Sequence, residues 1–253
     1  MRKMAKLSLF LLIFCLILSG CKNSDPVPTK PTLPPSSYAP EDFYYDGEFL
    51  ACYQTDVTLG IDVSYHQGVI DWQAVADSGV EFAFIRLGYR GLTGGQLHID
   101  ERVQENISGA REAGLLVGAY FYSQAISVEE ARQEAAFALE ILGDTELELP
   151  LVFDWEQEER TKNVPVDTVT DSAIAFCEAA KGAGYQPMVY FNRYQAEHLM
   201  DMSRLEDYPW WLAMYDVGKD FPCRMDIWQY SDTGSVPGIE GNVDLNILFP
   251  EIT

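Results

Sequence analysis

The chain has 253 residues, 47% of them hydrophobic, which is enough to bury one sizeable core. Its formal net charge is −22, from 39 acidic and 17 basic residues. An acidic chain without a basic patch is unsuited to binding nucleic acid, and we interpret the charge as a soluble extracellular surface.

The first 21 residues have the pattern of a bacterial lipoprotein signal peptide. A basic start precedes an apolar run over 7–18. As a helix this run would span about 18 Å, well short of a hydrocarbon core of about 30 Å, so it predicts a signal peptide and not a membrane span. The run ends in Leu-Ser-Gly-Cys, which resembles the lipoprotein box. We therefore expect removal of residues 1–20 and acylation of Cys21; the alternative is an ordinary signal peptide with a chance cysteine.

Residues 21–57 are interpreted as the acylated cysteine followed by a proline-rich linker. Six prolines lie between residues 22 and 40, among small polar residues that cannot bury a core. Such a segment favours a semi-rigid extended spacer of about 3.1 Å per residue. It would carry a globular domain, predicted over 58–253, from the extracellular face of the membrane into the cell wall.

Within the domain, helical stretches repeatedly end in Ala-Gly or Ser-Gly, and an apolar strand follows at once. Glycine after a helix end is the usual left-handed cap, and continuous apolar runs are typical of strands buried on both faces. After residue 208 helical patterns are weak, and short strand candidates follow one another. The pattern predicts an α/β barrel whose last strands are nearly helix-free. The alternative is an open doubly wound sheet, although no glycine-rich phosphate loop supports it. The three glycine-to-strand junctions are Gly79 before 82–86, Gly114 before 115–120 and Gly184 before 187–191.

In barrels of this kind the functional residues lie at the C-terminal ends of the strands. In this chain those ends have acidic and aromatic residues. Aromatic faces that stack on sugar rings, together with carboxylates, are typical of a carbohydrate site. The residues at these ends are Asp62, Arg86, Tyr120, Tyr122, Asp154, Glu156, Tyr190, Asn192, Trp228, Tyr230 and Asp244.

Asp154 and Glu156 stand two positions apart in an apolar strand, so both side chains should share one face. Close carboxylates resist joint ionisation, which raises one pKa and keeps that group protonated. A protonated carboxyl beside an ionised one is what glycosidic cleavage needs. On its own, Asp-x-Glu also fits a strand that runs into an acidic loop.

The cysteines and histidines indicate no metal site or cofactor. Cys177 lies in an apolar helical stretch, and Cys52 and Cys223 are candidate partners for a disulfide. The three histidines, His66, His98 and His198, are far apart in sequence, and we expect loop or surface positions for them.

Several longer motifs resemble glycoside hydrolase family 25. They are Gly60-Ile61-Asp62-Val63-Ser64-Tyr65-His66-Gln67-Gly68, Ile70-Asp71-Trp72, Phe84-Ile85-Arg86-Leu87-Gly88, Gly118-Ala119-Tyr120-Phe121-Tyr122-Ser123, Asp154-Trp155-Glu156, Trp228-Gln229-Tyr230 and Val243-Asp244-Leu245-Asn246. The resemblance runs in order over residues 58–250. It implies an irregular TIM-like barrel of eight strands and about five helices. It also implies a lysozyme that cleaves the β-1,4 bond from N-acetylmuramic acid to N-acetylglucosamine.

The resemblance further implies that Glu156 is the general acid and that Asp62, Asp154 and Asp244 complete the acidic cluster. Tyr65, Tyr120, Tyr190 and Trp228 fall where the family lines its sugar groove, and Arg86 and Tyr122 join them from the strand ends. The expected partners are peptidoglycan glycan strands and, through the lipid, the membrane; we expect a monomer. The alternatives are a non-catalytic wall-binding lipoprotein and a chitinase-like enzyme.

Overall fold

The computed structural model describes residues 33–250. The predicted signal peptide, Cys21 and the first part of the predicted linker lie outside these residues. Between residues 33 and 250, no helix has the length and apolar character that crossing a bilayer requires.

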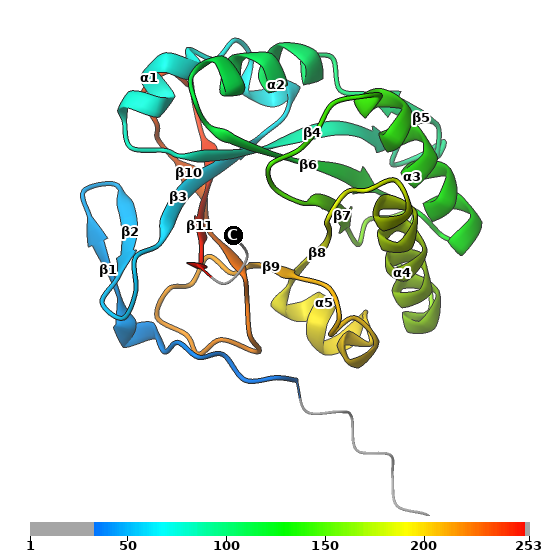
Figure 1. Cartoon of the computed structure of the whole chain (residues 1–253). Coiled ribbons are helices and arrows are strands. Elements are labelled where there is room, and N and C mark those ends of the chain that lie inside the picture. The colour runs from blue at the N-terminus through cyan, green and yellow to red at the C-terminus, as the bar shows by residue number, and fades with distance from the viewer. Residues whose placement is uncertain (1–32, 251–253) are drawn as a thin grey trace, which may run out of the picture. The chain divides into compact units, whose positions relative to one another are not determined.

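Eight strands of the described chain close into a barrel (Figure 1). Seven run parallel, while β11 is antiparallel to both of its neighbours, β10 and β3. A short outer strand, β5 (Leu97–Ile99), pairs with β4. In order around the barrel, the strands are β3 (Thr58–Val63), β4 (Phe82–Arg90), β6 (Leu116–Ser123), β7 (Leu151–Trp155), β8 (Pro187–Asn192), β9 (Trp210–Ala213), β10 (Ile227–Gly234) and β11 (Val243–Leu248).

The helices cover one side of this barrel. Helices α2, α3, α4 and α5 pack on strands β4 to β8, and α1 packs on α2. The prediction of an irregular α/β barrel with about five helices and nearly helix-free last strands is therefore confirmed. The helices are α1 (Trp72–Asp77), α2 (Val103–Glu112), α3 (Val128–Leu142), α4 (Val166–Gly182) and α5 (Arg193–His198), and single turns of 3-10 helix occur at Pro40–Asp42, Tyr65–Gln67 and Met202–Arg204.

The predicted glycine junctions are present where helices meet strands. Gly79, Gly114 and Gly184 have φ of 98°, 86° and 95°, the left-handed region in which a side chain would be strained. Each follows the last turn of a helix, and the next barrel strand begins within three residues. The start of α3 is capped by Ser127, whose hydroxyl accepts the backbone N–H of Glu130.

The core has two parts, because side chains alternate along each barrel strand. One cluster fills the barrel interior and includes Phe82, Phe84, Val152, Met188 and Trp211. The larger cluster lies between the outer face of the barrel and its covering layer. The interior cluster closes the bottom of the barrel, so the open end can hold polar groups.

A β-hairpin, β1 (Phe43–Asp46) with β2 (Phe49–Cys52), covers the outer face of β10. Phe43 packs edge-on against Trp228, and the backbone N–H of Leu50 donates to the hydroxyl of Tyr230. Figure 1 shows the hairpin on the side of the barrel opposite α3 and α4. The predicted linker boundary at residue 57 is thus corrected: the hairpin belongs to the folded domain and occupies a place where other parts of the barrel have helices.

Candidate active site

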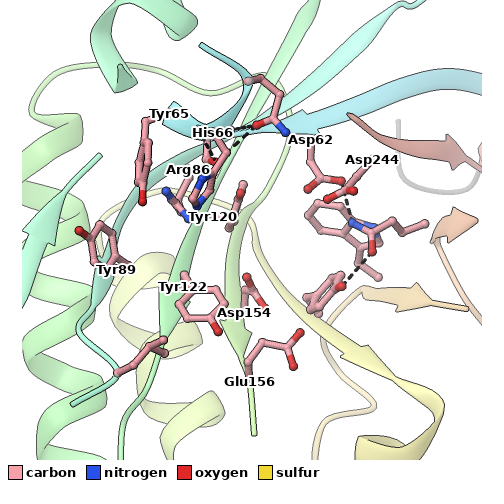
Figure 2. A pocket seen from close by; sticks show the side chains of 16 residues that line it. Asp62, Tyr65, His66, Arg86, Tyr89, Tyr120, Tyr122, Asp154, Glu156 and Asp244 are labelled. Atoms are coloured by element: carbon pink, nitrogen blue, oxygen red, sulfur yellow. Dashed lines mark hydrogen bonds between the residues drawn. The ribbon is translucent and has the colours of Figure 1, made fainter. Parts of the chain in front are cut away.

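One pocket at the open end of the barrel gathers almost all of the predicted site residues (Figure 2). Its volume is about 440 Å³. Nine of the ten residues predicted as catalytic or substrate-binding line it: Asp62, Tyr65, Arg86, Tyr120, Tyr122, Asp154, Glu156, Tyr190 and Asp244.

Asp244 reaches this pocket by a route that differs from the one expected. It lies near the start of β11 and not at a C-terminal strand end. Because β11 is antiparallel to its neighbours, its beginning lies at the same end of the barrel as the ends of the other strands. Asp244 is thereby the direct cross-strand partner of Asp62 on β3.

Asp62 and Asp244 form a hydrogen-bonded acid pair. Oδ2 of Asp62 also accepts the side-chain N–H groups of Gln229 and Asn246, each at 2.8 Å. Burial raises the pKa of Asp62, whereas these hydrogen bonds and the one with Asp244 lower it. Burial, followed by the charge of Asp62, raises the pKa of Asp244 to about 9. At neutral pH the pair therefore holds a proton, on Asp244.

A network of hydrogen bonds fixes this pair in place. Gln229 accepts the hydroxyl protons of Tyr190 and Tyr215 on Oε1, each at 2.9 Å. Asn246 accepts the indole N–H of Trp211 at 2.8 Å. Each amide therefore has an acceptor already occupied and must turn its N–H groups toward Asp62. Because of this network, Asp62 is the member of the acid pair that accepts the hydrogen bonds from Gln229 and Asn246.

Asp154 and Glu156 stand at the end of β7. Asp154 is the last inward-facing residue of the strand and is 7% exposed, and Glu156 follows the strand directly and is less buried. Burial, then the charges of Glu156 and Asp62, raise the pKa of Asp154 well above its usual value. Oδ1 of Asp154 is buried without a hydrogen-bond partner in the described chain.

The pKa of Glu156 is raised to about 7, by burial first and by the charge of Glu158 second, against a hydrogen bond from Gln195 that lowers it. The sequence had suggested that repulsion between Asp154 and Glu156 keeps one group protonated. In the structure this repulsion raises the pKa of Asp154, while Glu156 owes its raised pKa to burial and Glu158.

Arg86 supplies positive charge in this acidic pocket. Its Nε donates to Oδ2 of Asp100 at 2.9 Å, and its guanidinium carbon lies 4.9 Å from the ring centre of Tyr65 and 5.2 Å from that of Tyr89. Asp100 also accepts the backbone N–H of Tyr65, at 3.1 Å. Nη2 of Arg86 is buried without a hydrogen-bond partner in the part of the chain that the structure describes. The guanidinium is thus held rigidly with donor capacity left over.

Trp228 is the predicted site residue that does not line the pocket. It is fully buried on the outer face of β10, packs against Phe43 and Phe221, and donates its indole N–H to the backbone oxygen of Met214. The prediction that it lines the sugar groove is therefore wrong, because inward positions on β10 alternate with outward ones and Gln229 takes the inward place.

Sequence reasoning also missed several residues that the pocket contains. Trp211 and Gln229 face it from β9 and β10, and Tyr89 and His66 stand at its rim. Asn192 lines a neighbouring pocket that shares Glu156 and Tyr190. The two-residue period of strands shows that Trp211 and Gln229 alternate with their neighbours, but which set of residues faces inward follows from the pairing of β9 and β10.

The three cysteines that lie within residues 33–250 are free. Cys177 and Cys223 are buried and Cys52 is partly buried, and the candidate bridge between Cys52 and Cys223 is not formed. Among residues 33–250, no group of three or more histidine, cysteine or acidic side chains is arranged to hold a metal ion.

An α/β barrel with a carboxylate-rich, aromatic-lined mouth has the features of a glycosidase. Residues 61–239 match the family model described as glycosyl hydrolases family 25. The protein YegX of Escherichia coli (strain K12) is 33% identical over 197 residues, which cover 75% of this chain and 68% of YegX. The chain belongs to glycosyl hydrolase family 25 and is a glycoside hydrolase.

Two further relatives carry descriptive names. The autolytic lysozyme of Clostridium acetobutylicum is 30% identical over 189 residues, covering 74% of this chain and 54% of the relative. The modular autolysin LytC from Streptococcus pneumoniae, solved in complex with a synthetic peptidoglycan ligand, is 27% identical with a TM-score of 0.65. That match covers 76% of this chain and 47% of the LytC chain, so this chain spans about half the length of both proteins.

Proposed function

We propose that this protein is a muramidase that cleaves the β-1,4 bond between N-acetylmuramic acid and N-acetylglucosamine in peptidoglycan. Family membership and the lysozymes among its relatives support the substrate. The observation that carries the chemistry is the pairing of Glu156, whose pKa is raised to about 7, with Asp154, which has an unpartnered buried oxygen.

In this proposal Glu156 is the general acid. A carboxyl with a pKa of about 7 keeps much of its proton at neutral pH and can still give it up during reaction. The proton passes to the glycosidic oxygen as the bond from that oxygen to the sugar carbon breaks. The glycan with the new hydroxyl leaves, and Glu156, now ionised, accepts a proton from the water that attacks the sugar carbon.

Asp154 orients the substrate by hydrogen bonding, a role that its burial and its raised pKa allow. Its free Oδ1 is an acceptor aimed at the pocket, which suits the N–H of the substrate's acetamido group. Holding that N–H would place the acetamido oxygen next to the reacting carbon, where it can act as the internal nucleophile. This favours the substrate-assisted reaction over direct attack by water.

Substrate contacts come from the tyrosines and from Arg86. Tyr65 is 36% exposed at the rim, where its ring can stack on a sugar. The spare donor of Arg86 suits a substrate oxygen, because a buried guanidinium nitrogen without an acceptor is costly.

We further propose that the mature protein is a monomeric lipoprotein, anchored through Cys21 at the outer face of a bacterial membrane. The basic start, the short apolar run and the Leu-Ser-Gly-Cys sequence support this anchor. The proline-rich segment after Cys21 would give the barrel reach into the wall. Cell-wall glycan strands are then the substrate within range.

The test is the mass of products released from purified peptidoglycan and reduced with borohydride. A muramidase leaves N-acetylmuramic acid at every new reducing end, so muramitol is expected, and chitin oligosaccharides should stay intact. Glu156→Gln should lower turnover by at least about 10²–10⁴-fold with the circular dichroism spectrum unchanged. The matched control is Glu159→Gln, whose side chain is 86% exposed. Near-normal turnover by folded Glu156→Gln, or glucosaminitol as the product, would contradict the proposal.

A further inference from the structure

Gln195 is a buried amide that links helix α5 to the proposed general acid. It is the third residue of α5 and is 1% exposed. Its backbone N–H donates to Oδ1 of Asn192 at 3.0 Å, and its own Oε1 accepts the backbone N–H of Asn192 at 2.6 Å. These two bonds form a capping box at the start of the helix.

The capping box fixes which end of the Gln195 amide faces β7. Because Oε1 is occupied by the N–H of Asn192, Nε2 points the other way. There it donates to the backbone oxygen of Trp155 at 2.6 Å and to Oε2 of Glu156 at 3.2 Å. The reversed amide would set an acceptor against the acceptor of Trp155. Because Asn192 and Trp155 fix the two ends of the Gln195 amide, the group that faces Glu156 is the N–H donor.

We propose that Gln195 is a positioning residue that directs the acid proton of Glu156 onto Oε1. A protonated carboxyl has one carbonyl oxygen, which accepts hydrogen bonds, and one hydroxyl oxygen, which donates. The amide N–H at Oε2 makes Oε2 the carbonyl and leaves the proton on Oε1, the oxygen that Gln195 does not touch. Gln195 makes no contact with substrate in this scheme and acts through Glu156. The inference rests on the proposed role of Glu156.

Groups other than Gln195 hold the backbone around Glu156. The effect of Gln195 on the Glu156 side chain can therefore be tested separately. The carbonyl oxygen of Glu156 accepts Nε2 of Gln124 at 2.8 Å and the hydroxyl of Thr161 at 2.9 Å. Its backbone N–H donates to the oxygen of Ser123 at 3.3 Å. None of these bonds reaches the carboxyl. Loss of the Gln195 amide should therefore free the Glu156 side chain without releasing its backbone.

The hydrogen bond should also affect the pH dependence. A donor at Oε2 favours the ionised form of Glu156 and opposes burial and the charge of Glu158. Without the donor, the pKa of Glu156 should rise and the alkaline limb of the pH profile should move to higher pH. The other titratable or charged groups that face Glu156 or line its pockets are the acids Asp62, Asp154, Asp216 and Asp244, the basic groups His66, Arg86, Arg193 and Lys219, and the tyrosines Tyr65, Tyr89, Tyr120, Tyr122, Tyr190, Tyr194 and Tyr215.

The competing explanation is that Gln195 only caps α5, since an Asn-x-x-Gln sequence at a strand–helix junction is an ordinary capping box. Gln195→Glu separates the two roles. Glutamate in this position keeps an acceptor for the N–H of Asn192, so the cap survives. A glutamate side chain offers Glu156 no N–H. The ionised form has no proton to donate, and the single proton of the neutral form would be donated to the backbone oxygen of Trp155.

The experiment measures kcat, KM and the pH profile of muropeptide release for Gln195→Glu and Gln195→Met, with thermal unfolding of each. A hydrogen bond to an ionisable group contributes about tenfold to hundredfold. We expect a kcat loss of that size in both variants, a KM within about twofold, and in Gln195→Met an alkaline limb higher by about one pH unit. The control is Ala196→Gly, which weakens the same helix and leaves the amide in place, and its pH profile should match the wild type.

Three outcomes separate the explanations. A wild-type kcat in folded Gln195→Glu would overturn the positioning role and leave capping alone. A loss in Ala196→Gly equal to that in the Gln195 variants would also overturn it, since helix stability would then be the cause. If Glu156→Gln itself keeps its activity, the failure lies in the proposed function and not in the role of Gln195.

Discussion

Glu158→Gln should move the alkaline limb of the pH profile to lower pH. The general acid must be protonated, so kcat/KM of the free enzyme should fall above the pKa of Glu156, which is about 7. Burial is the first cause of this raised pKa and the negative charge of Glu158 is the second. Removing the charge lets Glu156 ionise more easily. Activity above pH 7 should decline, while the plateau at lower pH should stay the same.

The size of the shift follows from the position of Glu158. The turn after β7 holds it near Glu156, because Thr161 accepts the backbone N–H of Glu158 and donates to the carbonyl oxygen of Glu156. The Glu158 side chain is exposed, so water screens its charge. Two charges about 4 Å apart in water interact by about 1 kcal/mol, and by about half of that at twice the distance. At about 1.4 kcal/mol per unit, the shift is roughly half a pH unit, or about threefold in rate at pH 8.

The assay is kcat/KM for muropeptide release between pH 4 and pH 9, at low and at high salt. Glu159→Gln is the matched control, since it removes the same charge one residue further on, where Glu159 pairs with Lys162. Salt should shrink the effect of Glu158→Gln, because the charge is exposed. Equal shifts in both variants would mean that the overall surface charge, and not Glu158 in particular, determines the position of the alkaline limb. No shift in Glu158→Gln would refute the assigned cause of the raised pKa.

Two further predictions concern stability and targeting. Glu134→Gln should destabilise the fold by about 1.5–3 kcal/mol in urea unfolding, because the buried Arg90, 4% exposed and bonded to Glu134 at 2.6 Å, has a carboxylate replaced by a neutral amide and keeps only Glu130, at 3.9 Å, as a charged partner. Glu129→Gln, at a site where the side chain is 72% exposed, should change little, and a similar loss there would contradict the argument. Cys21→Ala should shift the protein from the membrane fraction to the medium or to unprocessed precursor; a processed form that stays with the membrane would disprove the lipid anchor.

The barrel was predictable because local and global signals agree in its first two thirds. Gly79, Gly114 and Gly184 mark helix ends by backbone geometry, which depends on few neighbours. The strands after them are apolar on both faces because helices cover the outside and side chains fill the inside. The signal weakens after α5, where the helix-free strands offer short runs and no capping residues.

The hairpin over 43–52 was not predictable from local pattern. Three of the four residues of β1 are exposed, and the strand gains its stability from Phe43, which is buried against Trp228 and Phe221. Those partners lie more than 170 residues later in the chain. A segment whose order depends on such distant contacts looks like an extension of the proline-rich linker when only neighbouring residues are considered.

The rest of the site depends on the direction of each strand and on which of its alternating residues face inward. The sequence motifs indicate neither. Trp228, Gln229 and Tyr230 are consecutive in the chain, yet Gln229 faces the acid pair and the other two face the hairpin. Which residues of β10 face inward is settled by its pairing with both neighbours, where Gln229 is level with Ala213 on β9 and with Asn246 on β11. Likewise Asp244 meets Asp62 because β11 reverses direction, which a parallel barrel would not predict. An aromatic residue beside a motif is therefore evidence for a sugar contact only after the register of its strand is known.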